Sequence, residues 1–94
     1  MRAPQGYEGL DLSDGFDYGT INVNDLIVTC DHYDPTDIQA FEVHHTYSRA
    51  GAWSFTGRDH EGVRCAVEFN ENDIMAHYDL LAVYTPIPNN EVQP

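Results

Sequence analysis

Apolar and polar residues alternate along much of the chain between residues 20 and 86, and this period of two is typical of half-buried β-strands. Turn-forming residues interrupt the alternation at short intervals, because Gly, Pro, Asn and Asp favour backbone conformations outside a strand. The pattern therefore predicts five short strands. They cover 20–30 (TINVNDLIVTC), 40–48 (AFEVHHTYS), 52–59 (AWSFTGRD), 63–69 (VRCAVEF) and 80–86 (LLAVYTP).

The alternation also predicts which side chains face inward, because successive residues of a strand point to opposite faces. The expected inward positions of the fourth strand are Val63, Cys65, Val67 and Phe69. Those of the first and second strands are Leu26, Val28, Cys30, Phe41, Val43, His45 and Tyr47. The core is therefore expected to be built on Val28, Val43, Trp53, Val63, Val67, Phe69 and Leu81.

Two connections have a composition of their own. The segment DHYDPTD (31–37) is expected to be a charged first loop, because Pro35 lacks an amide donor and Asp favours turns. The segment NENDIMAHYD (70–79) predicts a short helical turn before the last strand, with Asn70 or Asn72 as its N-cap.

Residues 1–19 are predicted to form an extended acidic arm, since glycines at 6, 9, 15 and 19 disfavour a helix. Its alternating acidic and aromatic residues suit a disordered binding segment. The alternative, which we favour, is that Leu10, Leu12 and Phe16 pack as an edge of the core. The expected organisation is thus an arm (1–19), a β-domain (20–86) and an unstructured tail (87–94).

The segments VNDLIV (23–28) and FNENDI (69–74) occupy the positions of two motifs in the Src-homology and Tudor class of small barrels. The chain resembles that class between Val23 and Tyr84. The resemblance implies a mainly β, five-stranded antiparallel barrel with one short helical turn before the last strand. The peptide-binding residues of Src-homology domains have no matching positions here, so the resemblance implies no ligand.

Charge limits the classes of function. The chain has 16 Asp and Glu against four Arg and no Lys, which gives a formal net charge of −12. Such a charge repels phosphate backbones and anionic membranes, so neither nucleic acid nor a membrane is an expected partner. The acidity fits a high-salt habitat, a GC-rich genome that favours Arg codons over Lys codons, or a surface that meets a basic protein.

The two cysteines, Cys30 and Cys65, are too few for a disulfide scaffold, and the first 15 residues contain no apolar run that resembles a signal peptide. No segment approaches the roughly 18 apolar residues of a membrane-spanning helix. We therefore expect an intracellular protein in the cytoplasm of a host cell, or one that is carried in a virion.

The cluster Cys30, Asp31 and His32 raises the question of a metal site. A Cys-x-His spacing is tight for zinc, and Cys65 with His45 or His77 would have to complete the ligands within a core of Val and Phe. Buried free thiols are the favoured interpretation. A calcium loop at DLSDGFD is rejected, because its glycine is one position early and no glutamate closes it. No metal and no cofactor is expected.

Catalysis is not expected either. His44 and His45 are neighbours in a strand, so they should point to opposite faces and not share one substrate. A Cys–His pair is formally available, but no oxyanion donor or orienting group can be named for it.

The favoured hypothesis is a non-catalytic acidic protein that competes with nucleic acid for a basic surface on another protein. In size and charge it is similar to the nucleic-acid-mimicking inhibitors of restriction, repair and CRISPR systems that viruses and mobile elements encode. The candidate contacts are carboxylates in three groups. They are Glu8, Asp11, Asp14 and Asp17 in the arm, Asp31, Asp34 and Asp37 in the first loop, and Glu71, Asp73 and Asp79 before the last strand.

Two alternatives stay open. The first is a virion assembly protein, such as a connector or minor capsid component, whose arm would contact a neighbour through Tyr7, Phe16 and Tyr18. The second is an interaction module of a halophile, in which the acidity reflects habitat alone. A contiguous acidic face would favour mimicry, whereas an even spread of charge would favour habitat.

Overall fold

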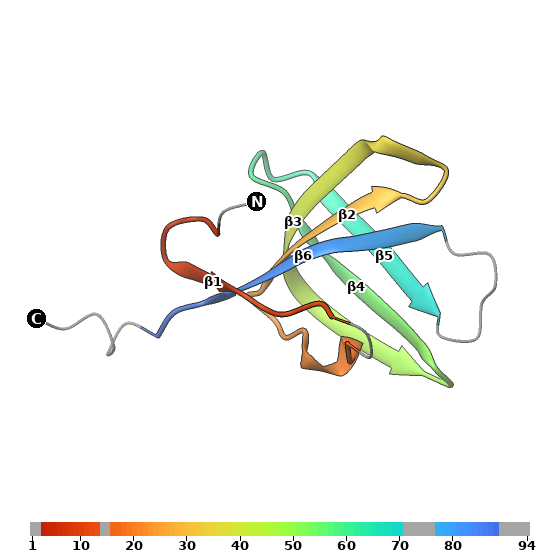
Figure 1. The fold of residues 1–94 in the computed structure, drawn as a ribbon, viewed down its shortest axis with the longest axis horizontal. Coiled ribbons are helices and arrows are strands. Elements are labelled where there is room, and N and C mark those ends of the chain that lie inside the picture. The colour runs from red at the N-terminus through yellow and green to blue at the C-terminus, as the bar shows by residue number, and fades with distance from the viewer. Residues whose placement is uncertain (1–2, 14–15, 71–76, 89–94) are drawn as a thin grey trace, which may run out of the picture.

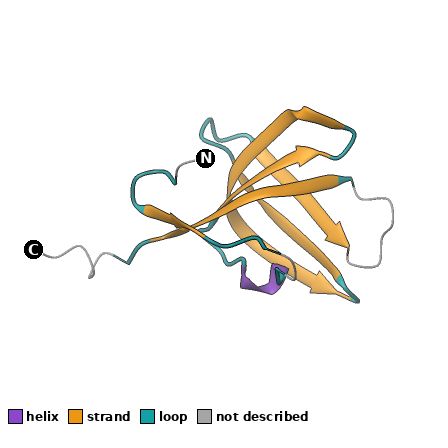
Figure 2. Ribbon diagram, viewed as in Figure 1, coloured by secondary structure: helices purple, strands orange, loops and turns teal. Residues whose placement is uncertain are grey.

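A computed structural model describes residues 3–13, 16–70 and 77–88. In these residues the protein is mainly β, as the alternation predicts, with a single turn of 3-10 helix, η1 (Tyr18–Thr20). The strands are β1 (Tyr7–Gly9), β2 (Leu26–Asp31), β3 (Asp34–Arg49), β4 (Ala52–Arg58), β5 (Arg64–Asn70) and β6 (Tyr78–Pro86). Figure 2 shows how little of the described chain is helical.

The strands form one antiparallel sheet in the order β1-β6-β2-β3-β4-β5, and its two edge strands lie at opposite ends of that order (Figure 1). The prediction of a five-stranded antiparallel barrel is therefore not confirmed. The sheet has a sixth strand, contributed by the N-terminal segment, and it is not closed, because no pairing among the described residues joins its edge strands β1 and β5. The 16-residue β3 pairs first with β2 and then with β4.

The N-terminal segment packs on the domain, so an arm separate from the domain is not confirmed. Tyr7 is paired with Pro86 in the β1–β6 ladder, and the Leu10 amide donates to the Val83 carbonyl at 2.9 Å. Leu10, Leu12 and Phe16 are partly buried and pack against the core, as the favoured interpretation predicted. Tyr18 packs against the core as well.

The core lies on one face of the sheet and is formed by Ile21, Ile27, Phe41, Val43, Phe55, Val67, Phe69 and Val83. The predicted inward face of β2 is wrong: Ile27 belongs to this cluster, and Val28 and Cys30 are buried on the other face. Four consecutive residues of β2 are buried, so burial does not alternate along this strand and does not mark one inward face.

Two residues predicted to lie in the core are exposed. Val63 is 58% exposed because it precedes β5 and belongs to the hairpin loop. Leu81 is 42% exposed because it is the extra residue where the register between β2 and β6 shifts, which turns its side chain away from the core. Val43, Val67 and Phe69 are buried, as predicted.

The expected first loop is instead a tight hairpin. Asp31 of β2 is paired with Asp34 of β3, so only His32 and Tyr33 lie between the two strands. The next pair is Cys30 with Ile38, and the ladder therefore skips residues 35–37, where proline has no amide to donate. The predicted helical turn in 70–79 falls largely outside the described residues.

Thr29 provides a test of this packing. Its side chain is fully buried in β2, and its Oγ1 has no hydrogen-bond partner among the described residues. Thr29→Val keeps the shape and removes the unsatisfied hydroxyl, so the free energy of unfolding should rise by about 1 kcal/mol in urea titrations. Thr29→Ser keeps the hydroxyl and loses a methyl group, and it should be less stable than the parent. A less stable Val variant would show that the hydroxyl is satisfied.

Candidate functional site

Four carboxylates gather at the end of the β2–β3 hairpin, and we call them the acidic tip: Asp31, Asp34, Asp37 and Asp79. Cross-strand pairing places Asp79 opposite Cys30 and Tyr78 opposite Asp31, which brings the start of β6 to the hairpin. Figure 1 shows this end of the sheet, with β2, β3 and β6 side by side. The sequence assigned Asp79 to a different group with Glu71 and Asp73, which lie outside the described residues.

Two of these carboxylates are fixed by local hydrogen bonds. Asp31 accepts from the Tyr33 amide at 2.8 Å, and Asp34 accepts from the Thr36 hydroxyl at 2.6 Å and from its amide at 3.1 Å. The Thr36 hydroxyl, and after it the amide, lowers the pKa of Asp34. Asp34 is therefore held in its charged form and in one orientation, which suits a contact with a cation.

Aromatic and imidazole rings accompany the acidic tip. His32 Nδ1 lies 3.0 Å from Asp79 Oδ1, and its ring meets Tyr33 edge-on. Tyr33 is 66% exposed between Asp31 and Asp34. Sequence reasoning left Tyr33 out of the candidate contacts, although its position in a run of turn residues placed an aromatic side chain in solvent.

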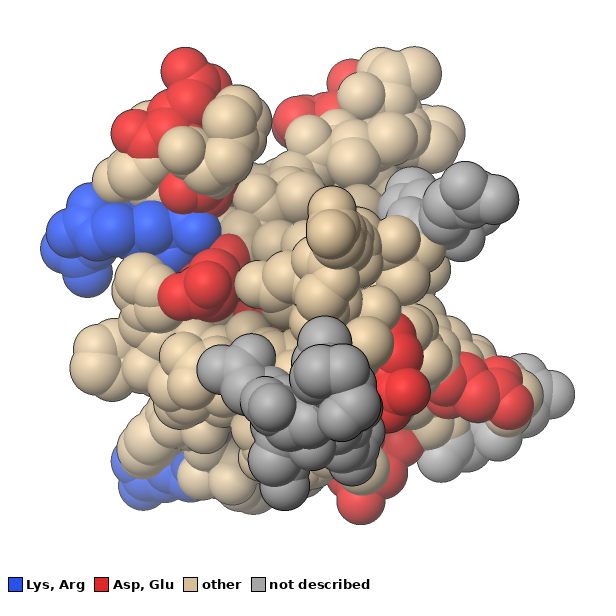
Figure 3. Space-filling view, turned by 90° about the vertical axis from the view of Figure 1, so that its left-hand side faces the viewer, with Lys and Arg blue, Asp and Glu red and all other residues tan. Residues whose placement is uncertain are grey.

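The predicted N-terminal carboxylates lie elsewhere. Glu8, Asp11 and Asp17 are exposed, and Asp14 lies outside the described residues. Asp11 accepts from the Ser13 amide at 3.0 Å, and Asp17 caps η1 by accepting from the Gly19 amide at 2.8 Å. On the face drawn in Figure 3, acidic side chains form separate groups with uncharged surface between them. Glu8 is paired with Thr85 near the end of β6, whereas the acidic tip lies at the start of that strand, so these two groups are separated along β6.

The three aromatic candidates of this segment have structural contacts. The Tyr18 ring stacks on Phe69 at 4.8 Å, and Phe16 meets Tyr18 edge-on at 6.0 Å. Tyr7 lies on β1 and borders a hollow of about 440 Å³ over β2 and β3. Phe16 and Tyr18 are half-buried, so truncating them would remove packing as well as any contact with a partner.

The acidic side chains are almost uncompensated by arginine. In residues 3–13, 16–70 and 77–88, no carboxylate forms an ion pair with Arg. The ion-pair contacts there join histidine to carboxylate: His32 to Asp79, His44 to Glu42 and, at 3.8 Å, His60 to Glu61. Asp25 differs from the rest, since it is buried and accepts from the Asn22 amide at 2.8 Å.

The thiols have the environment of core cysteines. Cys30 is buried, as predicted, whereas Cys65 is only partly buried and directs its Sγ to the Val63 carbonyl at 3.5 Å. Both are described, and neither forms a disulfide. Burial, followed by the charges of Asp79 and Asp31, raises the pKa of Cys30, which is the opposite of what a nucleophilic thiol needs. Within the described part of the chain, no three His, Cys, Asp or Glu side chains are arranged to hold a metal ion.

The prediction that His44 and His45 point to opposite faces rested on strict alternation, which the strand does not keep at this point. Val43 is paired with Gly57 and His45 with Thr56, so His44 is the extra residue of a β-bulge. A bulge interrupts the strict alternation of faces. Both histidines consequently border one small hollow of about 160 Å³. We call it the basic hollow, and its lining residues are His44, His45, Thr56, Gly57, Arg58 and Arg64.

A sign of this hollow is present in the sequence, although its arginines were not among the predicted contacts. In GRDHEGVR, a short turn separates Arg58 from Arg64, and such a hairpin places its flanking residues opposite each other. The structure pairs Arg58 with Arg64 across β4 and β5. Arg58 donates to the Gly62 carbonyl at 2.7 Å.

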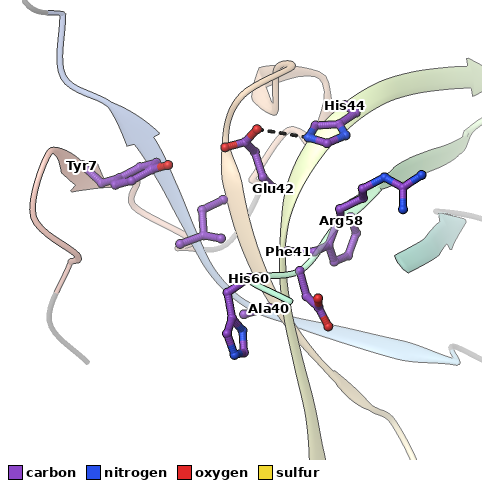
Figure 4. A pocket seen from close by; sticks show the side chains of 9 residues that line it. Tyr7, Ala40, Phe41, Glu42, His44, Arg58 and His60 are labelled. Carbon is purple, nitrogen blue, oxygen red and sulfur yellow. Dashed lines mark hydrogen bonds and ion pairs between the residues drawn. The ribbon is translucent and has the colours of Figure 1, made fainter. Parts of the chain in front are cut away.

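The larger hollow lies next to the basic one and shares His44 and Arg58 with it. Figure 4 shows Glu42 directed to His44, at 3.0 Å, with Arg58 on the same side of the strands. Glu42 is the cross-strand partner of Arg58, yet its carboxylate contacts the histidine. The lining offers imidazole, guanidinium and carboxylate groups but no hydroxyl or thiol nucleophile other than the Tyr7 phenol.

Comparisons with protein families, with curated proteins and with solved structures return no match to this chain. Among the described residues, no helix has the length and apolar character needed to cross a membrane.

Gly57 should be the least replaceable glycine of the sheet. A Cβ built there would lie 1.7 Å from the Glu42 carbonyl oxygen, so Gly57→Ala must push β3 and β4 apart. We expect the variant to lose about 3 kcal/mol or more of unfolding free energy, measured by urea denaturation. Gly9→Ala is the control, because its Cβ would meet Tyr84 at an ordinary 3.5 Å. Equal stability of the two variants would contradict this strand contact.

Cys30 should react slowly with iodoacetamide in the folded protein. Burial raises the pKa of both thiols, but Cys30 is buried whereas Cys65 is only partly buried. Alkylation of Cys65→Ser, which leaves only Cys30, should therefore be slower than that of Cys30→Ser. Because the folded pKa exceeds the unfolded one, the stability from Cys30 is complete below the ordinary thiol pKa and is lost as pH rises through the folded value. Fast alkylation of Cys30 near neutral pH would point to a reactive thiol.

Proposed function

We propose that this protein is a non-catalytic acidic protein that binds a basic surface of another protein and blocks nucleic acid from that surface. One observation carries the proposal: the carboxylates of the acidic tip have no arginine partner among the described residues, although the chain carries 16 acidic side chains. If these carboxylates served the fold through ion pairs, arginine side chains of the same chain would contact them. Carboxylates without an arginine partner remain available to the Lys and Arg of a partner protein.

The geometry of the tip supports recognition by charge. Local hydrogen bonds orient Asp31 and Asp34 before a partner arrives, so little side-chain entropy is lost on binding. Carboxylates held in this way take the place of phosphates on the partner, and the attraction weakens as salt rises. The exposed Tyr33 adds an aromatic side chain of the kind that is enriched at interfaces.

The alternatives have less support. An assembly protein that uses Tyr7, Phe16 and Tyr18 would need these rings to reach a neighbour, and the last two pack on the domain itself. Acidity that reflects habitat alone requires no ordered carboxylates at the hairpin. We therefore propose the acidic tip as the principal contact and the N-terminal carboxylates as a second one. A viral or mobile-element inhibitor of a nucleic-acid-binding enzyme fits this description.

The proposal is tested with three immobilised forms of the full chain. The tip variant carries Asp31→Asn, Asp34→Asn and Asp37→Asn, which preserve the hydrogen-bond acceptors. The control carries Glu61→Gln, Glu68→Gln and Glu91→Gln, which remove the same charge at positions that belong to neither proposed contact. The parent and the control should capture the same host proteins, and duplex DNA should release them. These proteins should bind the tip variant about tenfold more weakly.

Both variants should be as stable as the parent or more stable, because self-repulsion falls. Equal capture by the tip variant and the control would contradict a specific role for the tip. Capture that duplex DNA does not displace would contradict competition with nucleic acid.

A further inference from the structure

The basic hollow is the one place on the described part of this acidic protein where cationic side chains gather. Two of the four arginines and two of the five histidines of the chain line it. No described carboxylate lines the hollow, although Asp and Glu outnumber Lys and Arg by 16 to 4. The bulge at His44 and the absence of a side chain at Gly57 bring these arginines and histidines together.

The two arginines face each other without compensation. Arg58 and Arg64 are direct cross-strand partners, an arrangement of like charges that destabilises a sheet. Arg58 uses one guanidinium N–H on the Gly62 carbonyl, and Arg64 makes no hydrogen bond or ion pair with another described residue. An anion between them would remove the repulsion and use the remaining donors.

The carboxylates of Glu42 and Asp59 are engaged elsewhere, and Asp37, which borders a neighbouring hollow with Arg64, forms no ion pair with it. Glu42 contacts His44, and Asp59 accepts from the amides of Glu61 and Val63, both at 2.9 Å. These contacts hold the carboxylates in the strand and in the β4–β5 turn. Neither arginine forms an ion pair with a described carboxylate, so guanidinium donors remain available to an anion.

We propose that the basic hollow binds a phosphate-type oxyanion, with Arg58 and Arg64 as its guanidinium donors and His44 and His45 at its rim. Guanidinium groups match phosphate oxygens in paired, charge-assisted hydrogen bonds. A volume of about 160 Å³ admits one phosphoryl group. It is smaller than the roughly 300 Å³ of the smallest pockets for drug-sized ligands. The acidic surroundings disfavour a polyanion, so a duplex is not the ligand.

The phosphoryl group can belong to a free phosphate ion or to a phosphomonoester. Both present the same terminal oxygens to the arginines, and they differ in whether a substituent extends out of the hollow. The lining of the basic hollow includes no residue of the acidic tip, although Asp37 and Arg64 border a neighbouring hollow together. The inference does not depend on the function proposed above.

The test follows the backbone amide signals of Thr56 and Gly57 by NMR during titration at constant ionic strength and near-neutral pH. The probes are inorganic phosphate, O-phosphoserine and acetate. Phosphate should produce saturable shifts at these two amides in the parent. Arg64→Gln should weaken binding about tenfold, since a hydrogen bond from a charged donor is lost.

Arg49→Gln is the matched control. Arg49 is exposed at the far end of β3, outside the lining of the hollow, and its loss changes the net charge by the same amount. The control should bind phosphate like the parent. Binding of both phosphate and phosphoserine supports a site for a terminal phosphoryl group, and binding of phosphate alone supports a free-ion site.

Three outcomes would overturn the inference. One is the absence of saturable shifts at Thr56 and Gly57 in the millimolar range. Another is equal weakening by Arg64→Gln and Arg49→Gln, which would show a general charge effect. The third is acetate binding as tight as phosphate binding, which would contradict the ligand class. Because Arg64 is exposed and unpaired among the described residues, its replacement should leave the fold intact, and the amide spectrum reports this directly.

Discussion

The close approach of β3 and β4 at Gly57 is the constraint on which the form of the sheet depends. Only a residue without a Cβ leaves room for the Glu42 carbonyl at this point, and the bulge at His44 follows directly along the strand. A bulge bends its strand and increases its twist. β3 can therefore leave β2 and continue along β4, and the same bend places two histidines beside two arginines.

The sequence was informative where a strand has one buried face and one exposed face. In β5, Val67 and Phe69 alternate with exposed polar residues, and the predicted faces are confirmed. β2 gave no such contrast, because four of its consecutive residues are buried, and Ile27 was assigned to the wrong face. Parity reasoning also failed beyond each shift of register, as Leu81 and His45 show, since an inserted residue reverses every later assignment.

The candidate sites also differed in how far the sequence could predict them. Asp31, Asp34 and Asp37 could be grouped from the sequence, since they lie within seven residues. The position of Asp79 beside them depends on the pairing of β2 with β6, a contact between distant segments that local patterns do not encode. The basic hollow depends on a bulge, which leaves no mark in hydropathy. Net charge alone concealed it, because a total of −12 does not show where the arginines lie.

The position of β6 between β1 and β2 has a consequence for biosynthesis. The last strand to leave the ribosome is the one that joins the two earliest strands, so the sheet cannot be completed co-translationally until residue 86 is available. Until then, one edge of β2 has no neighbour, and the amide of Leu10 lacks the Val83 carbonyl. Such long-range pairing slows folding. The nascent chain must therefore hold an incomplete sheet in solution, and its dense negative charge is well suited to keeping such intermediates apart.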